Sequence, residues 1–123
     1  MEMRYGLQVK LISRGIKGRL EQSFETAVYR IVQEALTNVV RHAQAGHVQV
    51  RVTCGRKGLD LAISDDGKGM NLASIQRGTG LTGIRKRAHL FRGTMKLESQ
   101  PGKGTTLQVR FPSIPEAASC VKQ

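Results

Sequence analysis

The feature that most constrains this chain is a run of apolar pairs between Tyr29 and Ala43, which recur four residues apart. This spacing predicts an amphipathic helix with a broad buried face. On such a helix Glu34 and Asn38 lie one turn apart at the edge of the apolar face, and His42 follows one turn later. A half-buried carboxylate and carboxamide need polar partners. Hydrogen bonds within a core or a bound ligand would both supply them, and the helix alone favours the first.

Strict alternation of apolar and polar residues predicts five strands, near residues 7–11, 48–54, 59–63, 95–97 and 107–111. A second, shorter helix is expected over residues 81–91, stopped by Gly93. The order of strand, helix, strand, strand, loop, helix, strand, strand predicts an α/β two-layer sandwich with one wet sheet face. We expect one domain over residues 1–112 and a weakly ordered tail over residues 113–123.

The helix and loop boundaries carry weaker signals. Ser23 is the expected N-cap of the long helix, and Gly46 ends that helical region. Residues 66–80 contain four glycines and little periodicity, which is typical of a functional loop.

Composition leaves the ligand class open. The net charge of +11 suits nucleic acid, but the basic residues are scattered apart from Arg85-Lys86-Arg87, and five aromatics without tryptophan offer little base stacking. A cationic surface equally suits a nucleotide triphosphate. No apolar run approaches the length of a membrane span, and no secretory signal is visible. Cys54 and Cys120 are too few for a disulfide framework, and we expect reduced thiols in a cytoplasmic protein.

The sequence Asp65-Asp66-Gly67-Lys68-Gly69 directly follows a predicted strand. Alone it favours a turn. However, Gly78-Thr79-Gly80-Leu81 then opens a helix, whose N-terminal amides are suited to binding an anion. A carboxylate can accept a hydrogen bond from an exocyclic amine such as that of adenine. Together these parts indicate a nucleotide site. It is of neither Walker nor dinucleotide type, because GxxxxGK[ST] is absent and the GxGxxG at 78–83 does not follow a strand.

Four motifs occur in order: ExxxN in the first helix, DxGxG after a strand, GTGL before the second helix and GxGT before the last strand. Over residues 24–112 they resemble the ATP-binding domain of sensor histidine kinases, and most closely the nitrate-sensor and desaturase-sensor branch. The wider superfamily includes gyrase, Hsp90-type chaperones and mismatch-repair ATPases. The resemblance implies a Bergerat-type α+β fold, whose mixed, mainly antiparallel sheet is covered on one face by helices.

The resemblance also implies roles for residues of the first helix. Asn38 matches the ligand of a Mg²⁺ ion that bridges the triphosphate. Glu34 matches an acidic residue that positions or activates the phosphoacceptor. Arg41 matches a basic position that reaches the phosphates. His42 matches a ring that packs on adenine, and an ordinary half-buried histidine remains the alternative.

The remaining matches lie in the loops and at the last strand. Asp65 matches the carboxylate that accepts from the adenine N6 amine, and Thr105 matches the hydroxyl that supports this contact. The glycine boxes beside adenine and at the phosphates are matched by Gly67, Gly69, Gly78, Gly80 and Leu81. Arg85 and Arg87 are open between phosphate contact and a solvated surface.

Two departures from the family pattern qualify the function. The lid between Gly69 and Gly78 is short and lacks a phenylalanine motif. The helices that carry a phosphoacceptor histidine are absent, since His42, His47 and His89 all fall within the ATP-binding region.

The resemblance therefore implies the catalytic domain of a two-component sensor histidine kinase. Its cofactors would be ATP and Mg²⁺, and its partners a histidine-bearing dimerisation domain of the same kinase and a response regulator. We expect no autophosphorylation by this chain alone. We also expect no nucleic-acid partner, no membrane contact and a cytoplasmic location, which includes the cytoplasmic part of a membrane-bound sensor. The alternatives are a stand-alone ATPase or serine-directed kinase of the superfamily and, less favoured, a basic nucleic-acid-binding module.

Overall fold

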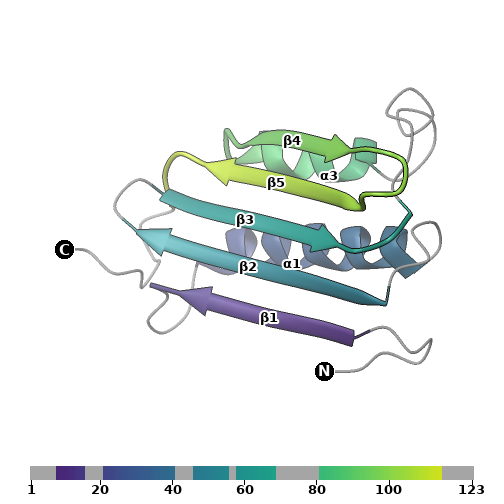
Figure 1. The fold of residues 1–123 in the computed structure, drawn as a ribbon. Coiled ribbons are helices and arrows are strands. Elements are labelled where there is room, and N and C mark those ends of the chain that lie inside the picture. Colours follow the sequence, from purple (N-terminus) through teal and green to yellow (C-terminus); the bar gives the residue numbers. More distant parts are fainter. Residues whose placement is uncertain (1–7, 16–20, 41–45, 56–57, 69–80, 115–123) are drawn as a thin grey trace.

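The computed structural model describes residues 8–15, 21–40, 46–55, 58–68 and 81–114. Its two helices and five strands are α1 (Gln22–Asn38), α3 (Leu81–Leu90), β1 (Gln8–Arg14), β2 (His47–Gly55), β3 (Gly58–Asp65), β4 (Thr94–Ser99) and β5 (Thr105–Phe111). The strands form one sheet in the order β1-β2-β3-β5-β4. β1 runs parallel to β2, and the other pairs are antiparallel. Both helices cover the same face of the sheet (Figure 1), which confirms the predicted two-layer sandwich.

The core lies between this sheet face and the helices. Alternate residues of the central strands are buried, as the alternation predicted; they are Val48, Val50, Val52, Cys54, Leu59, Leu61, Ile63, Leu107, Val109 and Phe111. Opposite them, Phe24, Val28, Ile31 and Ala35 form the buried face of α1. The open sheet face is polar. There the Asp60 carboxylate accepts hydrogen bonds from Gln108, with Nε2 at 3.1 Å from Oδ1, and from Arg110, with a guanidinium nitrogen at 3.4 Å from Oδ2.

Three phenylalanines fix the direction of α1 within the sandwich. The Phe24 ring, in the first turn of α1, meets the rings of Phe91 and Phe111 edge to face, with centroids 5.1 and 5.0 Å apart. Phe91 follows the end of α3, and Phe111 ends β5. The start of α1 therefore lies beside the ends of α3 and β5. The end of α1 lies at the other end of the sandwich, with the starts of α3 and β5 and the end of β3 (Figure 1).

Three local expectations were wrong. The N-cap of α1 is Glu21 rather than Ser23, because the Glu21 carboxylate reaches the backbone N–H groups of Ser23 and Phe24 and also accepts from the Ser23 hydroxyl. These three hydrogen bonds lower the pKa of Glu21.

Leu11 alternates correctly on β1 yet is 66% exposed, since β1 is an edge strand. Cys54 is buried and disulfide-bonded rather than a reduced thiol, because cysteine spacing carries no information about pairing.

Neither of the described helices is long and apolar enough to cross a membrane. The predicted tail lies mostly outside the described residues, at residues 115–123, and so do Leu7 and the segment 41–45 before Gly46.

Candidate functional site

Asp65 is the last residue of β3 and has the same parity as the buried Leu61 and Ile63, so it faces the helices at the rim of the core. Its Oδ1 accepts a hydrogen bond of 2.8 Å from the backbone N–H of Gly67. Burial raises the pKa of the Asp65 carboxyl group, and the charge of Asp66 adds to this rise. Hydrogen bonds from the backbone of Gly67 and Thr105 act in the opposite direction. The site thus holds a partly desolvated carboxyl group at the end of a strand.

A row of polar residues crosses the sheet at this point. Thr105 on β5 lies directly opposite Asp65, and Ser99 on β4 lies directly opposite Thr105. The hydroxyl oxygens of Ser99 and Thr105 are 2.8 Å apart, and the Ser99 hydroxyl also donates to the Gly104 carbonyl at 3.3 Å. The preceding row on the same face is apolar and consists of Ile63, Leu107 and Leu97. The apolar core therefore ends in one carboxyl and two hydroxyl groups. Ser99 was not among the residues predicted for the site, although its alternation with Leu97 places it on the same face.

The turn after Asp65 is packed against the glycine turn that precedes β5. Gly104 is buried and has a φ of +79°, and a Cβ atom there would lie 2.2 Å from the Asp65 carbonyl oxygen. Only glycine fits this position without a backbone shift. The backbone N–H of Gly102 also donates to the Lys68 carbonyl. The DxGxG and GxGT motifs are thus neighbours in space.

We expect Gly104→Ala to destabilise the fold more than Gly102→Ala. Both glycines have positive φ, which costs roughly 1 kcal/mol for alanine. A Cβ atom on Gly102 meets nothing within 4 Å, so it serves as the matched control. The overlap at Gly104 should cost at least about 1 kcal/mol more, because the Asp65 backbone must move. Urea denaturation of both variants measures the difference, and equal free energies of unfolding would contradict the close packing.

The helical residues of the predicted site lie at the same end of the molecule. Asn38 is the half-buried last residue of α1, and Glu34 is half-buried one turn earlier. Leu81 begins α3 and packs partly buried against the core. The Phe24 contacts place the end of α1 and the start of α3 beside Asp65 and Thr105 (Figure 1). The described part of the predicted site is therefore brought together at one end of the sandwich.

The roles of all the predicted site residues stay predictions, and several of these residues are not described. Arg41, His42, Gly69, Gly78 and Gly80 lie outside the described residues, as does the lid between the glycine boxes. On α3, Arg85 is exposed and Arg87 is half-buried. Within the described ranges, no three His, Cys, Asp or Glu side chains converge to hold a metal ion by themselves. The Asn38 carboxamide offers one oxygen, which is compatible with Mg²⁺ because that ion usually takes its other ligands from substrate phosphates and water.

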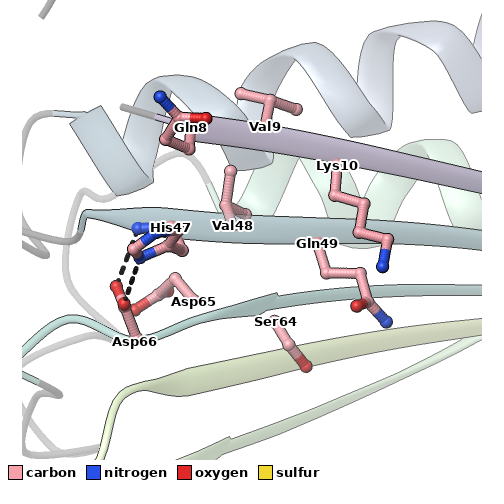
Figure 2. A pocket seen from close by; sticks show the side chains of 9 residues that line it. All are labelled: Gln8, Val9, Lys10, His47, Val48, Gln49, Ser64, Asp65 and Asp66. Carbon is pink, nitrogen blue, oxygen red and sulfur yellow. Dashed lines mark hydrogen bonds and ion pairs between the residues drawn. The ribbon is translucent and has the colours of Figure 1, made fainter. Parts of the chain in front are cut away.

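A cavity of about 480 Å³ reaches this end of the sheet, and Asp65 is one of the residues that line it (Figure 2). Its lining side chains include Lys10, Gln49 and Ser64, which project from the open face of the sheet, away from the helices (Figure 2). By strand parity the Asp65 side chain is on the other face. Because Asn38 and Leu81 belong to the helices and Asp65 has the helix-facing parity, we assign the predicted nucleotide site to the helical side of the sheet rather than to its open face.

A five-stranded mixed sheet covered on one face by two helices defines an α/β two-layer sandwich domain (Figure 1). The chain belongs to the family of histidine kinase-, DNA gyrase B- and HSP90-like ATPases, whose sequence profile matches residues 24–115. The resemblance inferred from the four motifs is thereby confirmed.

The similar proteins are histidine kinases rather than other members of this ATPase family. The oxygen sensor histidine kinase NreB of Staphylococcus carnosus (strain TM300) is 34% identical over 113 residues, which cover 90% of this chain and 33% of that protein. The histidine-protein kinase/phosphatase DegS of Brevibacillus brevis is 32% identical over 116 residues, which cover 94% and 30%. The ATP binding domain of PrrB from Mycobacterium tuberculosis matches with a TM-score of 0.70 at 30% identity, covering 88% of this chain and 81% of that one.

The chain spans about a third of the length of the curated relatives that it matches. Its family and its fold are those of the ATP-binding domain of histidine kinases.

Proposed function

We propose that this chain binds Mg-ATP at the site end of the sandwich, defined by Asn38, Asp65, Leu81 and Thr105. The observation that carries the proposal is the half-buried Asp65 carboxyl group, which pairs across the sheet with Thr105 beside a glycine turn. Family membership supports ATP as the nucleotide.

In this proposal Asp65 recognises the adenine base. Its carboxylate accepts a hydrogen bond from the N6 amine of adenine, which replaces part of the hydration that burial removes. The Thr105 hydroxyl, held by Ser99 at 2.8 Å, supports this contact. Gly67 and Gly69 let the backbone approach the base, and His42 packs on its ring. Guanine presents a carbonyl oxygen where adenine has its amine, so the arrangement selects adenine.

The other end of the nucleotide faces the helix termini. Asn38 supplies an oxygen ligand to Mg²⁺, whose charge when bound offsets that of the triphosphate. Arg41, Gly78, Gly80 and Leu81 contact the phosphates, the last three around the N-terminus of α3. Glu34, one turn before Asn38, positions or activates the acceptor. The work of these residues is mainly orientation and charge neutralisation.

We further propose that the chain is the catalytic part of a two-component sensor histidine kinase. The γ-phosphoryl group would pass to a histidine on a dimerisation domain and then to a response regulator. The domain would work in the cytoplasm, where ATP is available. The similarity to NreB and DegS over nine tenths of this chain supports the kinase branch over other members of the family.

Asn38→Ala tests the division of roles. We expect Mg-ATP affinity to fall about tenfold while adenosine affinity is nearly unchanged, because the side chain acts through the metal and the phosphates. Thr37→Ala is the matched control, since the Thr37 hydroxyl donates to the Gln33 carbonyl within the same helix. Isothermal calorimetry with both ligands measures the effect. Equal losses for Mg-ATP and adenosine would make Asn38 a structural residue.

A further inference from the structure

Asp66, the second aspartate of the DxGxG motif, is bonded to the start of β2. Its Oδ1 accepts hydrogen bonds of 2.9 Å from the backbone N–H groups of both Gly46 and His47. Its Oδ2 lies 2.8 Å from Nδ1 of His47 (Figure 2). The backbone N–H of Asp66 in turn donates to the His47 carbonyl at 3.1 Å. Four hydrogen bonds therefore join this one residue to two consecutive residues that come about twenty positions earlier.

These bonds act immediately after Asp65. The β2–β3 ladder ends with Val48 opposite Asp65, so Asp66 continues the attachment one residue beyond the sheet. On the other side, Gly102 bonds Lys68 and Gly104 packs on the Asp65 backbone. The turn that follows Asp65 is thus bonded to the start of β2 on one side and packed against the glycine turn before β5 on the other.

Asp66 cannot itself reach a base bound on the helical side of the sheet. By parity its side chain belongs to the open face, and the side chains of His47 and Asp66 are 74% and 53% exposed. Asp66 lines the cavity on that face together with His47 (Figure 2). Any effect on nucleotide binding must therefore pass through the backbone of Asp65 to Gly67.

We propose that Asp66 is a positioning residue for adenine recognition, whose bonds to Gly46 and His47 set the orientation of the Asp65 carboxylate. This inference rests on the proposed function, in which Asp65 reads adenine. The Oδ1 bonds to the backbone carry the effect, and the His47 ring contributes little because both side chains are exposed.

The test compares affinities for ATP and GTP, by calorimetry, in wild type and in variants of Asp66, His47, Asp60 and Asp65. In Asp66→Ala we expect ATP affinity to fall about three- to tenfold and the preference for ATP over GTP to fall with it. Asp66→Asn keeps an oxygen that can accept both backbone N–H groups, so it should stay within about twofold of wild type. His47→Ala, which leaves the backbone bonds intact, should do the same.

Asp60→Ala is the matched control. Asp60 lies on β3, faces the same side of the sheet as Asp66 and accepts side-chain hydrogen bonds, but it is far from the turn. Melting temperatures without nucleotide show whether each variant is folded. A general loss of stability would affect Asp60→Ala and Asp66→Ala alike and would leave the ratio of ATP to GTP affinity in the folded protein unchanged.

The outcomes separate the inference from the function on which it rests. An unchanged ATP preference in folded Asp66→Ala, while Asp65→Asn loses it, would overturn the inference alone. Absence of ATP binding by wild type would overturn the proposed function and the inference together. If Asp66→Ala does not fold, Asp66→Ser is used, because its side chain is one bond shorter and withdraws the acceptor oxygen from the two backbone N–H groups. A wild-type preference in that variant would equally overturn the inference.

Discussion

Replacing Asp65 by asparagine should weaken ATP binding by about 1.5–3 kcal/mol, or roughly ten- to 150-fold. The amide substitutes a neutral group for a charged acceptor and can turn a donor towards the donor amine of adenine. Selectivity for ATP over GTP should fall at the same time. Calorimetry with ATP and GTP measures both effects, and circular dichroism checks the fold. An unchanged dissociation constant in a folded variant would refute the assignment of Asp65.

The same substitution should stabilise the empty protein at neutral pH. Burial is the largest cause that raises the pKa of Asp65 above its ordinary value of 3.8. A raised carboxyl pKa contributes stability below the unfolded pKa, and this contribution is lost as pH rises through the folded value. At pH 7 the ionised Asp65 is therefore unfavourable in the folded state, and asparagine removes that cost.

The pH dependence provides the control for this effect. Asp65→Asn should melt at a higher temperature than wild type at pH 7, and the difference should shrink as the pH approaches the ordinary value of 3.8, where the wild-type carboxyl group becomes neutral as well. A lower melting temperature at pH 7 would show that the charged form is favoured in the fold. That result would contradict a partly desolvated, ligand-seeking carboxylate.

Phosphotransfer should require a second domain: we expect none by this chain alone. With radiolabelled ATP, we expect no stable label on this chain alone and label on a histidine after mixing with the dimerisation domain of its kinase. The reason is geometric, because transfer requires an acceptor in line with the γ-phosphate, and His42 is assigned to the adenine end of the ligand. Label that is acid-labile and base-stable identifies phosphohistidine. Acid-stable label would instead favour a serine-directed kinase, and free phosphate without label would favour an ATPase.

Glu34→Ala should reduce this transfer more than it reduces ATP affinity, because its proposed role is at the reacting end. Gln33→Ala is the matched control, since Gln33 is the exposed neighbour on α1. Stable label on the chain alone would contradict both the expected absence of autophosphorylation and the role proposed for Glu34.

Strand-borne features of the site were predictable because alternation fixes which face a residue occupies. Asp65 and Thr105 continue the parity of Ile63 and Leu107, so their shared face could be inferred from the sequence. That they stand directly opposite each other could not be inferred, because it depends on β3 pairing with β5, which comes forty residues later. The positions of Ser99 and Asp66 depend on register in the same way.

Local signals failed where two polar residues compete. Ser23 has the better N-cap propensity, but the longer Glu21 side chain reaches two amides and the Ser23 hydroxyl at once. Leu11 fitted the alternation, and only the position of β1 at the sheet edge explains its exposure.

The phenylalanine cluster has a consequence for which substitutions this fold can tolerate. All three phenylalanines of the chain, Phe24, Phe91 and Phe111, interlock at the end farthest from Asp65 and Thr105. The packing that closes the fold and the proposed recognition of the nucleotide therefore depend on separate sets of residues. Substitutions around the ligand can accumulate while the far end keeps the fold closed, so new specificities can evolve on this scaffold without first acquiring compensating stabilisation.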